Sequence, residues 1–165
     1  MLAEILVNQE YSNSDAWAAY RIGQAFESDG KLQQSYKFYA KATTLAEYNL
    51  EFQNKLGSIQ VAMQKLSDAK NTFEFILSEN PLYASAHVNY GYTLLLLGNP
   101  VKAEEHYDIA LSLNPDQVQA LLNKAGLHLL KEEREQALIF IERVLELEPD
   151  NIQAINVRDR LRQQY

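Results

Sequence analysis

The sequence predicts an all-α fold, an α-solenoid built from antiparallel helix pairs. The main observation is one constant spacing, the repeat period, which relates two sets of positions: Gly23, Gly57 and Gly91, and Pro81, Pro115 and Pro149. Small and large residues of the expected second helices follow the same step: Ser35, Ala69, Ala103 and Ala137, and Tyr39, Phe73, Tyr107 and Ile141. A period of about 34 residues is typical of helical arrays in which each unit packs on its neighbours.

The best-preserved repeat shows how each helix pair is expected to fold. A first helix is expected over 84–97, because Gly98 can adopt the left-handed backbone conformation that ends a helix. The second helix is expected to begin at Asn99 and Pro100, since Asn caps free N–H groups and Pro suits the first helical turn. It is expected to end before Asn114.

This pattern resembles the tetratricopeptide repeat, in which a glycine lies where the paired helices cross, a small residue and an aromatic residue occupy the second helix, and a proline closes the unit. The resemblance covers four repeats and a C-terminal capping helix: 16–49, 50–83, 84–117, 118–151 and 152–165. It implies a right-handed superhelix of helix pairs that binds other proteins.

Three features depart from the family pattern. Glu47 stands where the closing proline is usual, so we expect the first repeat to end in a less sharp turn. In the fourth repeat Lys124 stands where a leucine-like residue is expected, and Ala125 and Gly126 replace the crossing glycine. We therefore expect the fourth helix pair to be shifted by one residue.

The N-terminal segment 1–15 has two interpretations. Leu2, Ile5 and Leu6 fall where the second helix of an earlier repeat would place its apolar residues, which suggests a truncated repeat and a chain that is part of a longer protein. The alternative is a frayed terminus. The segment does not resemble a signal peptide, because it carries Glu4 and lacks a basic start.

Composition restricts the classes of partner. A net charge of −7 and a pI near 5.0 argue against duplex nucleic acid and anionic membranes, which both reward a basic surface. The chain has no cysteine, which excludes disulfides, thiolate nucleophiles and zinc–thiolate sites. No apolar run approaches the ~20 residues of a membrane span, so we expect a soluble chain, of unknown compartment, that does not insert into membranes.

No catalytic or cofactor motif is present in the sequence. The three histidines, His87, His106 and His128, fall on different predicted helices and lack the spacing of a helical metal site. The sequence has no glycine-rich phosphate loop and no nucleophile motif. We therefore predict that the chain is not an enzyme and holds no metal or cofactor.

The family resemblance places a peptide-binding groove on the first helix of each repeat. Carried over position by position, its lining is Trp17, Tyr20, Arg21, Gln24, Asn54, Lys55, Val88, Asn89, Tyr92, Leu95, Leu96, Leu122, Asn123 and Leu129. The pattern of Lys, Asn and Arg by which the family binds chaperone C-termini is missing at these positions, so that ligand is not expected.

The C-terminal half of this lining is apolar. Six residues are expected to form a strip with Tyr92 as its central contact: Val88, Tyr92, Leu95, Leu96, Leu122 and Leu129. The alternative is that Leu95, Leu96 and Leu129 are buried between repeats.

A polar row runs through the same lining, with one residue from each repeat: Arg21, Lys55, Asn89 and Asn123. The amides are suited to holding a peptide backbone and the cations to pairing with acidic ligand side chains. Alternatively, the two cations neutralise Glu27 and Glu51.

Two functions follow from these observations. The first is a non-catalytic module that binds a peptide or helix of another protein in the groove. The alternative is a structural spacer or self-association domain, whose partner is another copy of the chain or a neighbouring domain.

Overall fold

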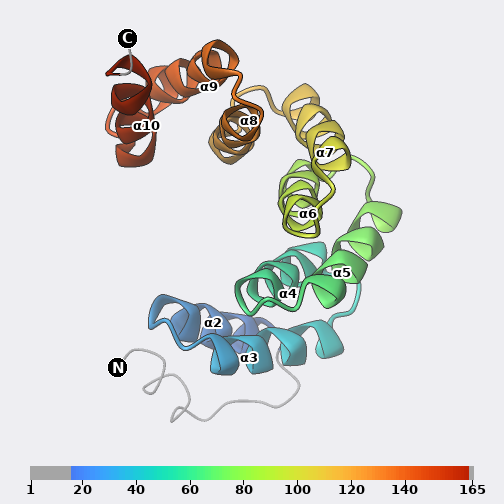
Figure 1. Cartoon of the computed structure of the whole chain (residues 1–165). Coiled ribbons are helices and arrows are strands. Elements are labelled where there is room, and N and C mark those ends of the chain that lie inside the picture. The colour runs from blue at the N-terminus through green and yellow to red at the C-terminus, as the bar shows by residue number, and fades with distance from the viewer. Residues whose placement is uncertain (1–15, 164–165) are drawn as a thin grey trace. The chain divides into compact units, whose positions relative to one another are not determined.

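The computed structural model describes residues 16–163, in which nine α-helices and no strands occur. The predicted helix within 1–15 lies outside the described residues. Figure 1 shows the helices in chain order, from α2 in blue to α10 in red. Their bounds are α2 Ala16–Ser28, α3 Leu32–Leu45, α4 Leu50–Ala62, α5 Leu66–Glu79, α6 Ala84–Leu96, α7 Pro100–Leu113, α8 Val118–Leu130, α9 Arg134–Leu147 and α10 Ile152–Arg162. The all-α prediction is confirmed.

The caps of the third helix pair follow the sequence signals. Gly98 has a φ of 79°, in the left-handed region, and directly follows Leu97, the C-cap residue of α6. The side chain of Asn99 accepts a hydrogen bond from the backbone N–H of Lys102, and Pro100 is the first residue of α7. The turn between the two helices is therefore encoded locally.

The helix pairs keep one register throughout the described chain. First helices begin at Ala16, Leu50, Ala84 and Val118, each one repeat period after the last. The predicted one-residue shift of the fourth pair is wrong. The exit from the first pair is also unchanged: Ala46 has φ −144° and ψ 72°, close to −142° and 93° at Asn114, so the looser turn expected from Glu47 is not observed.

The helices fall into two compact units, one ending at Pro81 and the other beginning at Leu82. In the N-terminal unit, which holds helices α2 to α5, an aromatic core joins α2, α3 and α4. Tyr20 stacks on Phe52 with ring centroids 4.7 Å apart, and Trp17 lies nearly perpendicular to the same Phe52 ring, also with centroids 4.7 Å apart. Tyr20, Tyr39 and Phe52 are buried.

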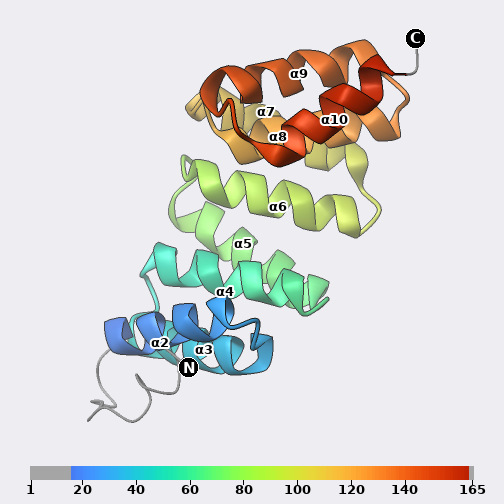
Figure 2. The same ribbon diagram turned by 90° about the vertical axis from the view of Figure 1, so that its left-hand side faces the viewer.

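In the C-terminal unit, helices α6 to α10 pack around two aliphatic clusters. The larger joins α8, α9 and α10: Leu121, Leu122, Ala125, Ile141, Val144 and Ala154. The smaller joins α6, α7 and α8 through Val88, Ala110 and Ala120. Figure 2 shows α10 beside α9 at the C-terminal end of this unit, where its buried Ala154 and Leu161 cover the last apolar surface.

The surroundings of Lys124 show how a lysine is accommodated where the family pattern has a leucine-like residue. Its side chain is only 8% exposed, but its ammonium group lies 2.7 Å from the Asp108 carboxylate and 3.4 Å from that of Glu104. It also lies 5.5 Å from the centre of the Phe140 ring. The buried charge is thus compensated from α7 and α9, as a charge in a protein interior must be.

Candidate functional site

In the N-terminal unit, the predicted groove residues divide by exposure. Trp17 is 51% exposed, and Arg21 and Gln24 are exposed on the same helix. Tyr20, in contrast, is 4% exposed, and its hydroxyl donates a hydrogen bond of 2.8 Å to Glu51. Because Tyr20 is part of the aromatic core, its prediction as a groove residue is corrected.

The predicted polar row is partly used within this unit. The Lys55 ammonium group lies 3.4 Å from the carboxylate of Glu27, which also accepts a hydrogen bond from the Tyr39 hydroxyl. Burial, and then the Glu27 hydrogen bond, raise the pKa of Tyr39. The alternative interpretation therefore describes Lys55, whereas Arg21 forms no ion pair within 16–163. Asn54 is half-buried beside Lys55.

In the C-terminal unit, two predicted apolar anchors are inaccessible. Val88 is 2% exposed and packs with Ala110 and Ala120, and Leu122 is 8% exposed within the larger cluster. These side chains point toward neighbouring helices and not toward the predicted groove. The prediction failed because a helix phase judged from one sequence can be off by about one residue. Their role as ligand contacts is corrected.

The other predicted residues of this unit remain accessible. Tyr92 is 43% and Leu96 39% exposed, whereas Leu95 and Leu129 are half-buried, so complete burial between repeats is not observed. We call this set the α6–α8 face: Asn89, Tyr92, Leu95, Leu96, Asn123 and Leu129. The helices that carry it contact each other. The Oδ1 atom of Asn123 accepts a hydrogen bond of 3.0 Å from the Gln119 amide, which leaves the Asn123 amide donors outside that bond.

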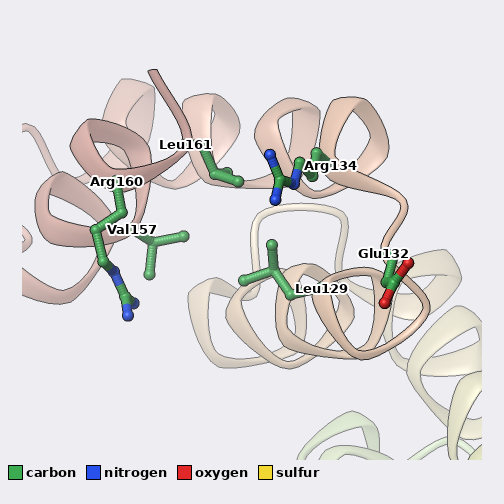
Figure 3. Close-up of a pocket in the computed structure, with 6 residues that line it drawn as sticks. All are labelled: Leu129, Glu132, Arg134, Val157, Arg160 and Leu161. Carbon is green, nitrogen blue, oxygen red and sulfur yellow. The ribbon is translucent and has the colours of Figure 1, made fainter. Parts of the chain in front are cut away.

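A cavity of about 480 Å³ adjoins this face between α8, the start of α9 and α10. Six residues line it: Leu129, Glu132, Arg134, Val157, Arg160 and Leu161. Figure 3 shows Leu129 facing Val157, with Arg160 on one side of them and Glu132 on the other. Its floor can accept an apolar side chain, and its charged groups can bind the polar atoms around it.

Only Leu129 of these six was predicted. The sequence nevertheless carried a signal for two more, because Val157 and Arg160 stand one repeat period after Asn123 and Gly126. Continuing the first-helix lining into α10 would have found them. Arg134 lies on a second helix, where the family lining does not extend.

A pair of histidines was also missed. Nδ1 of His87 on α6 lies 2.9 Å from Nδ1 of His106 on α7, and the rings stack with centroids 5.1 Å apart. Burial, and then the neighbouring His87, lower the pKa of His106. Because the two histidines belong to different helices, their separation in the chain gives no helical spacing by which to recognise the pair. Among the described residues no group of three or more His, Cys, Asp or Glu side chains is placed to hold a metal ion.

Glu104 forms ion pairs with two lysines of this unit, Lys124 and Lys131. Hydrogen bonding to Lys131, whose ammonium group lies 2.6 Å away, lowers the pKa of the Glu104 carboxyl, and the same bond raises the pKa of Lys131. Glu104 thereby ties α7 to the turn after α8.

None of the helices between residues 16 and 163 is both long and apolar enough for a membrane span.

Comparison with models of known protein families shows which family the chain belongs to. Three family models described as tetratricopeptide repeat match residues 18–49, 54–117 and 94–161. The chain belongs to the tetratricopeptide repeat family. The predicted resemblance is confirmed, and the family fold generally mediates protein–protein interaction and is typically non-catalytic.

Two human proteins contain similar segments. The chain is 44% identical over 50 residues to protein O-mannosyl-transferase TMTC1 and 42% identical over 67 residues to cilia- and flagella-associated protein 70. The matches cover 30% and 41% of this chain. They cover only 6% of each human protein, so the likeness concerns a repeat segment within much longer chains.

Solved structures share the fold at low sequence identity. The crystal structure of YrrB, described as a TPR protein with an unusual peptide-binding site, has a TM-score of 0.68 and 20% identity, and the match covers 88% of this chain and 75% of that one. The Cut9–Hcn1 structure of the APC/C has a TM-score of 0.77 and 18% identity, with 88% and 30% covered. These likenesses establish the tetratricopeptide architecture of the chain.

Proposed function

We propose that this chain is a non-catalytic interaction module that binds a peptide or helix of another protein on the α6–α8 face. The observation that carries the proposal is the exposure of Tyr92 and Leu96, 43% and 39%, on one face of α6. Large apolar side chains that remain accessible together commonly mark interaction sites, and tyrosine is enriched among the residues that dominate binding.

The polar members of this face suit an extended ligand. An asparagine amide offers both donors and an acceptor, the combination that a peptide backbone requires. Asn89 and Asn123 stand one repeat period apart, at equivalent positions of neighbouring first helices. The peptide-binding site named for YrrB, a structural neighbour, is consistent with this mode.

The N-terminal unit offers a second, smaller surface of the same kind. Trp17, Arg21 and Gln24 are exposed on α2, and Trp17 is held in place by Phe52. We assign to it an auxiliary role, because its neighbouring cation Lys55 already pairs with Glu27.

The test compares the full chain with two charge-introducing variants as baits in a lysate of the source organism. Tyr92→Glu places a carboxylate on the α6–α8 face. Tyr48→Glu makes the same change at a tyrosine that is 69% exposed in the turn before α4, outside the predicted lining. We expect specific proteins to be retained by the unmodified chain and by Tyr48→Glu but lost by Tyr92→Glu. Equal retention by all three would contradict the proposal.

Self-association is the second candidate, and one observation favours it. A cavity of about 670 Å³ on α8 and α9 has four apolar lining residues, Leu121, Leu138, Ile139 and Phe140, beside four charged ones, and Ile139 is 62% exposed. Light scattering over a concentration series tests this function. If the chain self-associates, its mass rises with concentration and the Ile139→Glu variant keeps the mass of a monomer. A constant monomer mass for the unmodified chain rules self-association out.

A further inference from the structure

The cavity beside Leu129 contains two guanidinium groups without an internal partner. Three other arginines of the C-terminal unit form ion pairs of 2.6 to 2.9 Å: Arg143 with Asp116, Arg158 with Asp159, and Arg162 with Glu142. Arg134 and Arg160 form no ion pair or side-chain hydrogen bond with any residue in the described part of the chain. Both line the same cavity (Figure 3).

The floor of this cavity is apolar. Leu129 and Val157 are half-buried and Leu161 is 8% exposed, so their side chains are held by the packing of α8 and α10. The volume of about 480 Å³ falls within the range of ~300–1,000 Å³ that is typical of ligand pockets. One large apolar side chain would cover the floor and leave the charged groups around it.

The charges of the cavity are arranged unequally. Two guanidinium groups and one carboxylate line it, which is a local positive excess in a chain whose net charge is −7. Arg160 and Glu132 stand on opposite sides of the apolar floor (Figure 3). A ligand carboxylate is therefore attracted to the Arg160 side and repelled from the Glu132 side, which also gives the ligand a direction.

We propose that this cavity binds an acidic side chain, aspartate or glutamate, of a peptide ligand together with a neighbouring large apolar side chain. The carboxylate accepts hydrogen bonds from the guanidinium group of Arg160, the apolar side chain lies on Leu129 and Val157, and Arg134 adds a second positive charge to the cavity lining. Guanidinium groups favour such planar acceptors, and the charge-assisted bonds are about twice as strong as neutral ones. This inference rests on the proposed function, because Leu129 belongs to both surfaces, and it specifies the class of peptide.

The experiment selects random 12-residue peptides, displayed on phage as N-terminal fusions without a free C-terminal carboxylate, on the immobilised full chain. Four baits are used in parallel: the unmodified chain, Arg134→Gln, Arg160→Gln and Arg162→Gln. Arg162 is the matched control, because it lies on α10 but pairs with Glu142 and does not line the cavity. Circular dichroism confirms that each variant is folded.

We expect peptides selected on the unmodified chain and on Arg162→Gln to carry Asp or Glu within two positions of a large apolar residue. This preference should disappear on Arg160→Gln and weaken on Arg134→Gln. A synthetic peptide of the selected sequence should bind Arg160→Gln about ten-fold more weakly, the usual effect of losing a hydrogen bond to a charged group. Exchanging its acidic residue for the amide should weaken binding to the unmodified chain by a similar factor but have little effect on Arg160→Gln.

The failures of the two proposals are distinguishable. Peptides that bind, depend on Tyr92 and show no acidic preference would overturn the carboxylate inference alone. An acidic preference that persists on both Arg134→Gln and Arg160→Gln would show that this cavity is not its cause. If no peptide is enriched above an unrelated bait protein, both the peptide-binding function and this inference are wrong.

Discussion

Gly91 of α6 lies directly against the ring of Tyr107 on α7. A Cβ atom built on Gly91 would lie 2.6 Å from Tyr107 Cε1 and 3.0 Å from the backbone oxygen of Ala103. The first two pairs are alike, with Gly23 against Tyr39 and Gly57 against Phe73. The fourth pair has Ile141 at the position of this aromatic residue, and Ala125 fits there with 1% exposure. The crossing glycine is thus required only where a ring lies across it, which explains why its loss caused no shift in register.

The first prediction concerns two glycines of the C-terminal unit. Gly91→Ala should destabilise the unit, because the overpacking cost of about 1–3 kcal/mol exceeds the helix-propensity gain of about 1 kcal/mol. Gly126→Ala should stabilise it by up to about 1 kcal/mol, since nothing lies within 4 Å of the added Cβ atom. Urea unfolding measures both, and equal effects would mean that the contact with Tyr107 does not determine the choice of glycine.

At the scale of the element, the third helix pair differs from the others because its two helices each contribute a histidine to one hydrogen-bonded pair. His87 and His106 occupy the positions that hold Ala19 and Phe38 in the first pair and Leu121 and Phe140 in the fourth. A neutral pair satisfies its hydrogen bond with one proton between the two Nδ1 atoms. When both rings are protonated, both Nδ1 atoms are donors and the bond is lost.

The second prediction is a pH dependence of the C-terminal unit. The folded pKa of His106 is below its ordinary value of 6.5, so the unfolded chain binds a proton first as the pH falls. The stability that this lowered pKa represents is complete above pH 6.5 and is lost as the pH falls toward the folded value. His87, Lys102 and Glu105 are the charged or titratable neighbours that affect His106, and Glu105 opposes the shift.

Thermal unfolding at pH 7.5 and 5.5 measures this effect. His106→Phe places at this position the residue found in the first and fourth pairs. Its melting temperature should fall less between pH 7.5 and pH 5.5 than that of the unmodified chain. His128→Gln is the control, because His128 belongs to a separate contact with Glu133 at 2.6 Å. An unchanged pH response in His106→Phe would show that the histidine pair is not the source.

At the scale of the whole molecule, the two compact units are a consequence of the repeat architecture. In a repeat array each helix pair packs mainly on its neighbours, so stability is distributed along the chain rather than concentrated in one core. The only tryptophan, Trp17, lies in the N-terminal unit and contacts Tyr20 and Phe52. Its fluorescence therefore reports on that unit, whereas circular dichroism reports on all helices.

The third prediction uses this separation. Leu127 is 1% exposed in α8, and Leu127→Ala should cost about 2–5 kcal/mol in the C-terminal unit. We expect the urea midpoint by circular dichroism to fall while the midpoint of Trp17 fluorescence changes little. Coincident shifts of both signals would show instead that the chain unfolds as a single cooperative unit.

The fold was predictable because its signals are local or periodic. Gly98, Asn99 and Pro100 act through backbone geometry and caps within a few residues, and the constant repeat period sets the helix order. The candidate site was predictable only in part. Tyr92 and Leu96 are accessible as expected, but Val88 and Leu122 are buried, because a rotation of about 100° per residue separates an exposed position from a packed one.

The sequence by itself determined the all-α class, the repeat period and the family, since each rests on spacing along the chain, whereas the register of the fourth helix pair came from the structure. Only the tertiary structure decided which charges remain unpaired. Lys124 is compensated by Asp108 from another helix, whereas Arg134 and Arg160, from two different helices, line one cavity without a partner among the described residues. Ion pairing and burial depend on distances between residues far apart in the chain, and these distances follow from how the helices pack.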